Sequence, residues 1–284
     1  MRTLIPQKQY PPRSLLDKFN LFKKKGLRVT IGLCVHREIS AETMYAVQSI
    51  LACPDPIFSV AMERGDALIE RSRSILASKF LKMDDDILLF VDDDIFFQSE
   101  DAIKICKEAV ELGIVGGCYV TKSEIQPTLQ QKIYKEQEII LSPDAKPVEV
   151  RAASTGFMAI HRRVFEKMIE DKDKFPLCYP QKFYPFFKTG CRKVDGLMRF
   201  LGEDWNFCAN AEELGFKSYL DPSIRLVHFG RYAYTVDDIN RPKRVEGQIL
   251  RYREQFDEFP LDSQSSEVPN DRELSKEGGN SDGA

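Results

Sequence analysis

Apolar and polar residues alternate along the first 120 residues in a way that predicts strands separated by helices. Residues 27–34 alternate and are rich in β-forming side chains, which predicts the first strand. Residues 87–91 form an unbroken apolar run, typical of a strand buried on both faces of a sheet. The other expected elements are strands at 57–62 and 114–120 and helices at 41–51, 67–81 and 101–112. This order predicts a doubly wound α/β sheet with right-handed crossovers.

The second half of the chain has a weaker pattern. We expect strands at 148–160, 216–220 and 224–228, with the last two flanking a turn at Asp221-Pro222, and helices at 161–171 and 204–214. Residues 172–200 have no clear period and predict a long loop, with six aromatic residues between 175 and 187. This aromatic segment is either a lid over a substrate or a hydrophobic flap packed on the core.

The two ends of the chain differ in charge from its centre. Residues 1–26 carry seven Lys or Arg and one Asp, which predicts a basic leader that either is solvated or touches nucleic acid or an anionic membrane surface. Residues 261–284 carry six acids and two bases without an apolar face, which predicts a disordered acidic tail. Between them we expect one domain at 27–240 and a C-terminal helix at 241–260.

Composition narrows the class of protein. The 284 residues are 43% hydrophobic and 30% charged, as in an ordinary globular protein. The seven cysteines are odd in number and include no C-x-x-C pair, which excludes a complete disulfide framework and gives no support to a zinc knuckle. No apolar run approaches the roughly 18 residues of a membrane span, and the first residues lack the apolar segment of a secretory signal. We therefore expect a cytoplasmic protein.

Three consecutive aspartates, Asp92, Asp93 and Asp94, follow the most apolar strand. Parallel sheets place ligand chemistry at the carboxyl ends of their strands, and a divalent cation is a simple way to hold crowded carboxylates together. The competing interpretation is an acidic turn. Residues 84–86 are also aspartates, but they precede the strand, roughly 17 Å away at about 3.3 Å per residue. We expect them to form a solvated turn at the opposite edge.

Two further sites of charge lie near predicted element ends. Glu203 and Asp204 begin a predicted helix, where Asp204 either caps the helix or serves as an ionised proton acceptor. His228 ends a predicted strand, where an imidazole is either structural or a ligand for an ion such as Mn²⁺.

Taken in order, these motifs resemble those of a known family. An apolar strand ending in D-x-D, a Gly-Phe element before a helix, G-E-D-W-x-F and L-D-P-x-I-x-L-x-H-x-G are similar to the GT-A glycosyltransferases, especially the inverting family-2-like branch. The resemblance covers roughly residues 27–235 and implies a GT-A fold, a Rossmann-like mixed sheet in a single domain.

The resemblance also implies a reaction and its residues. Asp92, Asp94 and His228 would hold Mn²⁺ or Mg²⁺, with Asp92 also meeting the ribose of a nucleotide-diphosphate sugar and Asp93 as the spacer in this nucleotide site. The metal would neutralise charge on the departing diphosphate. Asp204 would be the general base for an acceptor hydroxyl, assisted by Glu203.

Other residues would complete the nucleotide-sugar site in this resemblance. Thr30 and Cys34, in the first strand, would border the base and ribose. Arg71 and Arg73 lie where relatives often carry an Arg-Asn pair, although this chain has Arg73-Ser74, which leaves the Asn contact in doubt. Thr155 and Gly156 would line the sugar pocket, where glycine permits close backbone approach.

Rival functions remain open at this point. A D-x-D phosphohydrolase of the haloacid-dehalogenase type wants Thr or Val soon after the second Asp, whereas this chain has Ile95-Phe96-Phe97. The acids are also compatible with a two-metal nucleotidyltransferase and with a non-catalytic protein that binds a nucleotide sugar or glycan. The acceptor of a transferase would be a glycan, a protein, a lipid head group or a modified nucleic-acid base.

Overall fold

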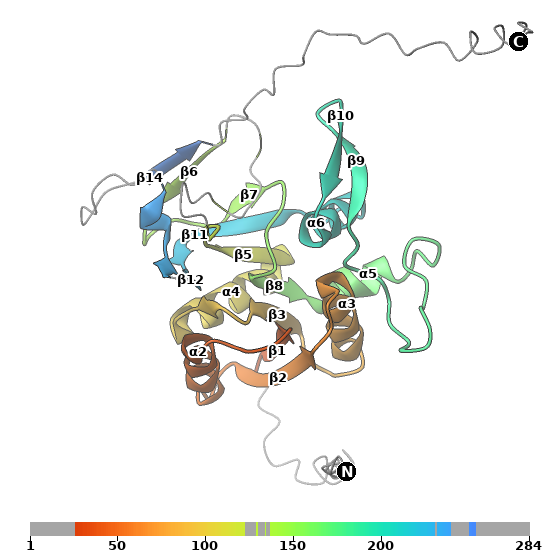
Figure 1. Cartoon of the computed structure of the whole chain (residues 1–284), viewed down its shortest axis with the longest axis horizontal. Coiled ribbons are helices and arrows are strands. Elements are labelled where there is room, and N and C mark those ends of the chain that lie inside the picture. The colour runs from red at the N-terminus through yellow and green to blue at the C-terminus, as the bar shows by residue number, and fades with distance from the viewer. Residues whose placement is uncertain are drawn as a thin grey trace, which may run out of the picture. The chain divides into compact units, whose positions relative to one another are not determined.

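A seven-stranded mixed sheet forms the centre of the protein (Figure 1). The computed structural model describes residues 26–122, 129, 134, 137–230, 232–239 and 250–253. The strands of the sheet are β1 (Arg28–Val35), β2 (Ile57–Arg64), β3 (Ile87–Asp92), β5 (Ile114–Cys118), β7 (Val148–Val150), β8 (Phe157–His161) and β11 (Ser218–Arg225). Their order is β2-β1-β3-β8-β5-β11-β7. The α/β class with one mixed sheet is therefore confirmed.

The directions of the strands show where the sheet departs from a parallel one. β2, β1 and β3 are parallel, β8 runs antiparallel between β3 and β5, and β11 is parallel to β5. The single strand expected at 148–160 is wrong: its first part is β7, at the sheet edge against β11, and its last part is β8. The break falls around Thr155 and Gly156, where the backbone turns.

Helices cover both faces of this sheet (Figure 1). They are α2 (Ala41–Leu51), α3 (Ile69–Phe80), α4 (Ser99–Leu112), α5 (Arg162–Met168) and α6 (Glu203–Glu213), with a 3-10 turn η2 (Val236–Asp238). α2 has the bounds predicted from its apolar spacing, and the Ser40 side chain caps it by accepting from the Thr43 amide at 3.0 Å. α4 ends at Gly113, whose φ of 93° favours glycine.

β3 divides its side chains between two cores. Ile87, Leu89 and Val91 pack into a cluster with α2 and α4, whereas Leu88 and Phe90 pack into a second cluster with α3, α5 and α6. All five are at most 1% exposed. A strand whose neighbouring side chains point to opposite faces must be apolar at every position when both faces are covered, which explains the unbroken run.

The segment expected to be one long loop contains a hairpin and a packed flap. Strands β9 (Gly190–Val194) and β10 (Leu197–Leu201) pair antiparallel. Phe175, Phe186 and Phe187 are buried in the second core, and the Ser74 hydroxyl accepts from the Phe187 amide at 3.0 Å. The hydrophobic-flap interpretation therefore holds for these rings, because they complete a core rather than cover a pocket.

Short strands extend the structure beyond the main sheet. They are β4 (Ile95–Phe96), β6 (Glu138–Leu141), β12 (Val227–Phe229), β13 (Ala233–Tyr234) and β14 (Leu250–Arg253). The expected turn at Asp221-Pro222 is wrong, because both residues lie within β11, whose register shifts there.

The ends of the chain are described only in part. Residues 250–253 of the expected helix 241–260 are strand β14, since their backbone pairs antiparallel with β6. The leader, apart from Gly26, and the tail at 261–284 lie outside the described residues. Within the described part of the chain, no helix has the length and apolar character needed to cross a membrane.

Candidate functional site

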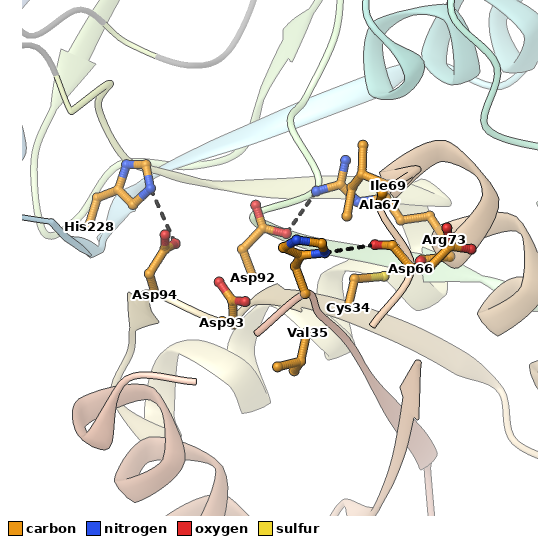
Figure 2. Close-up of a pocket in the computed structure, with 12 residues that line it drawn as sticks. Cys34, Val35, Asp66, Ala67, Ile69, Arg73, Asp92, Asp93, Asp94 and His228 are labelled. Atoms are coloured by element: carbon orange, nitrogen blue, oxygen red, sulfur yellow. Dashed lines mark hydrogen bonds and ion pairs between the residues drawn. The ribbon is translucent and has the colours of Figure 1, made fainter. Parts of the chain in front are cut away.

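A pocket of about 340 Å³ opens at the carboxyl ends of β1 and β3 (Figure 2). It is lined by Cys34, Val35, His36, Asp66, Ala67, Ile69, Ser72, Arg73, Asp92, Asp93, Asp94 and His228. The adjacent end residues Cys34 and Asp92 are paired in register between these strands. The aspartate triplet therefore lies at the edge of the sheet where the sequence predicted ligand chemistry.

Asp94 and His228 face each other across a short two-strand ladder (Figure 2). His228 pairs with Ile95 in register, and the Phe229 amide donates to the Asp94 carbonyl at 2.8 Å. The His228 Nε2 atom lies 3.3 Å from Asp94 Oδ1. His228 Nδ1 lies 2.7 Å from the Val120 carbonyl oxygen, which can only accept, so Nδ1 carries the proton. Nε2 can then donate to Asp94 when the ring is doubly protonated, whereas in the neutral ring it carries a lone pair that is available to a metal ion.

Lys122 is the second partner of Asp94. Its Nζ forms an ion pair with Asp94 Oδ2, on the other oxygen from His228. Burial raises the pKa of Asp94, but hydrogen bonds and charge from His228 and Lys122 outweigh it and hold that pKa below its usual value. Asp94 is therefore held as a carboxylate.

The donors around Asp94 suit a hard or borderline divalent cation. A carboxylate oxygen and an imidazole nitrogen are both ligand types for Mn²⁺, and Mg²⁺ or Mn²⁺ in nucleotide sites takes its other ligands from phosphate and water. Asp92, the third predicted ligand, is bound by Arg73 instead. Among the described residues, no three His, Cys, Asp or Glu side chains form a ready-made metal cluster. Two residues, Asp94 and His228, therefore fit the role of ligands for such a cation.

Arg73 joins the aspartate triplet to the start of α6. Its Nη2 donates to Asp92 Oδ1 at 2.7 Å, and its Nη1 donates to Glu203. The Arg73 side chain is 6% exposed. Despite burial, which lowers its pKa, the charges of Asp92, Glu203 and Asp204 raise the pKa of Arg73. Both terminal nitrogens of the Arg73 guanidinium are bound to carboxylates of the protein, so Arg73 holds Asp92 and Glu203 in place.

Glu203 and Asp204 lie at the first turn of α6 but do not line the pocket. Burial raises the pKa of each, and the charge of Arg73 only partly offsets it. Asp204 Oδ1 accepts from the Trp205 amide at 2.8 Å. A carboxylate of raised pKa is a stronger base than an exposed one. Arg73 connects this pair of acids to Asp92, which does line the pocket.

Gly156 positions Asp92 through the backbone. The Gly156 carbonyl accepts from the Asp92 amide at 3.0 Å, and its own amide donates to the Tyr119 hydroxyl at 3.0 Å. A Cβ at this position would overlap that hydroxyl oxygen, so only glycine fits. Thr155 is fully buried, and its hydroxyl has no hydrogen-bond partner among the residues that the structure describes. Neither residue is among those lining the pocket.

Asp93 lies between Asp92 and Asp94 and also lines the pocket. Burial and the charges of Asp94 and Asp92 raise the pKa of Asp93 to about 6. Its carbonyl accepts from the Ser40 amide at 2.8 Å, which ties the triplet to the start of α2. The middle aspartate therefore lines the pocket and anchors the turn.

The structure separates the remaining predicted residues. Cys34 lines the pocket, and burial raises the pKa of its thiol to about 12. Arg71 is not among the residues lining the pocket, but it binds Asp66, which is, through two hydrogen bonds of 2.6 and 2.7 Å. Thr30 lies near the amino end of β1, away from the pocket, where its hydroxyl donates to Asp85 at 2.6 Å.

Asp85 corrects the expectation of a solvated turn at residues 84–86. It is 5% exposed and accepts from the side chains of Arg28, Thr30 and Ser59. Two of these three donors are hydroxyls on adjacent strands, which the acidic composition of the turn did not reveal. Asp85 is a buried anchor at the edge of the sheet remote from the pocket.

Several residues of the pocket region were not predicted. Lys122 and Tyr119 follow β5, and His36 and Asp66 follow β1 and β2. His36 Nδ1 lies 3.2 Å from the Asp66 carbonyl oxygen. The available signal was position, since His36, Asp66 and Lys122 lie just beyond the carboxyl ends of predicted parallel strands, and Tyr119 lies near the end of the one predicted at 114–120.

Comparisons with known proteins give little beyond these observations. No protein-family model matches the chain, and no curated protein matches it. Among solved structures, the chain is similar to a crystal structure of GalNAc-T7 with UDP, GalNAc and Mn²⁺, with 13% sequence identity and a TM-score of 0.45. The match covers 75% of this chain and 45% of that chain, so this protein spans less than half the length of that neighbour.

Proposed function

We propose that this protein is a metal-dependent glycosyltransferase that moves a sugar from a nucleotide-diphosphate sugar to an acceptor hydroxyl, with inversion at the transferred carbon. The convergence of Asp94 and His228 at the carboxyl edge of the sheet is the observation that carries this proposal. Asp92 and Arg73 then link that pair to the two acids at the start of α6.

The donor would occupy the pocket at the ends of β1 and β3. Asp94 and His228 would hold Mn²⁺ or Mg²⁺, which supplies positive charge for the departing diphosphate. Asp92 would meet the ribose or a water of the metal, while Cys34 would lie beside the nucleoside because it lines the same pocket. Arg71 is less suited to the diphosphate, since Asp66 occupies its guanidinium.

The acceptor would be activated by Asp204. A hydroxyl is a weak nucleophile at neutral pH, so a carboxylate must take its proton as the new bond forms. Burial strengthens Asp204 as a base, and Arg73 keeps Glu203 and Asp204 from repelling Asp92. Glu203 would orient this group through its ion pair with Arg73.

Release of nucleoside diphosphate from UDP-, GDP- and TDP-sugars in the presence of Mn²⁺ tests the proposal. We expect turnover of at least one donor and a loss of about 100-fold or more in both Asp94→Asn and Asp204→Asn. Asp144→Asn, on an exposed turn that does not line the pocket, is the matched control and should keep full activity. Full activity in the two site variants would disprove the assigned roles, and product analysis with glycan, protein, lipid or nucleic-acid acceptors would identify the acceptor.

A second candidate is a protein that binds a nucleotide sugar without transferring it. The observation in its favour is that neither Glu203 nor Asp204 is among the residues lining the pocket. In that case a nucleoside diphosphate would bind with Mn²⁺ and compete with the donor, but no donor would be cleaved. Calorimetric binding combined with the release assay separates the two functions.

A further inference from the structure

Lys122 places a second positive group where a divalent cation would bind. The Lys122 Nζ atom forms an ion pair with Asp94 Oδ2, and His228 Nε2 lies 3.3 Å from Asp94 Oδ1. The Asp94 carboxylate is thus engaged from both sides by groups of this chain. A cation that binds Asp94 must therefore compete with the ammonium group for the same carboxylate.

The fold makes room for this lysine. Gly230 follows β12, the strand that carries His228, and a Cβ at Gly230 would lie 2.9 Å from Lys122 Cδ. The absence of a side chain at Gly230 lets the aliphatic stem pass beside the histidine strand. One short segment therefore serves both partners of Asp94. β12 carries the imidazole of His228, and Gly230, which follows β12, leaves space for the Lys122 side chain.

The lysine can also leave. Its side chain is 35% exposed, against 10% for His228, so the ammonium group can move into solvent while the histidine stays in place. A divalent ion and an ammonium group on one carboxylate repel each other, which favours that movement.

We infer that Lys122 is a built-in cation that holds Asp94 when no divalent ion is bound and lowers the affinity of the site for that ion. This inference rests on the proposed function, because it concerns the metal that the proposed transferase would use. Lys122 is a positioning residue in this role. It maintains the Asp94 carboxylate in place without the metal, and it must be displaced when the metal binds.

Binding of Mn²⁺ to the full chain, measured without donor by the electron paramagnetic resonance signal of free Mn²⁺, tests the inference. Lys122→Met should bind Mn²⁺ about three- to tenfold more tightly than the wild type, as expected for removing one partly exposed cation from the site. Lys122→Arg keeps the charge and should stay near the wild-type affinity. Gly230→Ala, which pushes the lysine aside, should shift the affinity in the same direction as Lys122→Met.

Lys167→Met is the matched control, since Lys167 also forms an exposed ion pair, with Glu170 next to α5. Unchanged or weaker Mn²⁺ binding by Lys122→Met, or an equal gain in Lys167→Met, would overturn the inference. Nucleoside-diphosphate release is measured in parallel. If Lys122→Met binds Mn²⁺ more tightly but no donor is cleaved, the glycosyltransferase proposal is wrong and the role of Lys122 stands. If a donor is cleaved but Lys122→Met has unchanged Mn²⁺ affinity, the glycosyltransferase proposal stands and the role of Lys122 is wrong.

Discussion

At the scale of single residues, Arg73 is a buried cation shared between two elements. It contacts Asp92 at the end of β3 and Glu203 at the start of α6, and its charge also lowers the pKa of Asp204. Breaking a buried ion pair from one side leaves uncompensated charge, which costs more than the pair itself contributes. Arg73 is therefore a determinant of stability as well as of site geometry.

Arg73→Met should lower the free energy of unfolding by about 2–4 kcal/mol at pH 7, as measured by urea denaturation. Without Arg73 the folded-state pKa values of Glu203 and Asp204 rise further above those of the unfolded chain. A carboxyl with a raised folded pKa destabilises the protein above its unfolded pKa, so the loss should shrink as pH falls toward 4. Arg71→Met, on the same helix but exposed, should change stability little, and a loss independent of pH would contradict this explanation.

Gly156→Ala tests the contact that positions Asp92. The new methyl group would overlap the Tyr119 hydroxyl, so we expect a loss of about 1–3 kcal/mol in the free energy of unfolding. In a Tyr119→Ala background the ring is absent and the same substitution should cost much less. An equal cost in both backgrounds, measured by a double-mutant cycle, would show that Tyr119 is not the obstacle.

At the scale of secondary-structure elements, one buried carboxylate ties together three strands. Asp85 precedes β3 and accepts from Thr30 on β1 at 2.6 Å, from Ser59 on β2 at 3.1 Å and from Arg28 at 3.0 Å. Burial raises the pKa of Asp85, but these hydrogen bonds and the Arg28 charge hold it below its usual value. The contact fixes the edge of the sheet opposite the pocket.

Asp85→Asn should lower the free energy of unfolding by about 1–3 kcal/mol at pH 7. Because the folded-state pKa of Asp85 is depressed, its contribution is present above the unfolded pKa, near 4, and is lost as pH falls through the lower folded value. The difference between wild type and variant should therefore narrow in acid. Asp173→Asn, on an exposed loop, serves as the control, and a constant difference down to pH 2 would disprove the ionic contribution.

At the scale of the whole molecule, the aromatic flap completes the core that lies between the main sheet and helices α3, α5 and α6. The Phe186 ring packs on Phe165 and Phe175 with centroids 5.0 and 5.9 Å apart, which joins the flap to α5. The flap also meets α6, since the rings of Phe187 and Phe207 are stacked at 4.5 Å. A flap held by these contacts belongs to the folded core.

Phe186→Ala should therefore cost about 3–5 kcal/mol in the free energy of unfolding. Tyr179→Ala, in the same segment but 69% exposed, should change it by less than about 0.5 kcal/mol. Both are measured by urea denaturation. A small effect of Phe186→Ala would favour the lid interpretation, because a lid can open without disrupting the core.

Local elements were predictable because their signals lie in neighbouring residues. The helix at 41–51 follows from its apolar spacing, and the buried strand follows from its apolar run. The place of β8 between β3 and β5 was not predictable, since pairing between distant segments leaves no local pattern. The same holds for the hairpin at 190–201, whose exposed Met198 and Phe200 obscure the alternation of a half-buried strand.

The site was predictable to the extent that strand ends identify it. Asp94 and His228 were found because each ends or follows an apolar strand, and the structure brings them together. Lys122 and Tyr119 were missed, because their contacts depend on how β5, β8 and β12 are arranged. Thr30 was expected beside the nucleotide because it lies in the same strand as Cys34. The paired register places Cys34 next to Asp92 at the pocket and Thr30 next to Leu88, closer to the other end of the strand.

The pairing of β4 with β12 brings together two residues that are distant in the sequence. Asp94 and His228 are far apart in sequence, yet a single backbone hydrogen bond from Phe229 to Asp94 sets their separation. The pairing of β12 with β4, rather than the length of chain between the two residues, therefore determines where the two side chains meet.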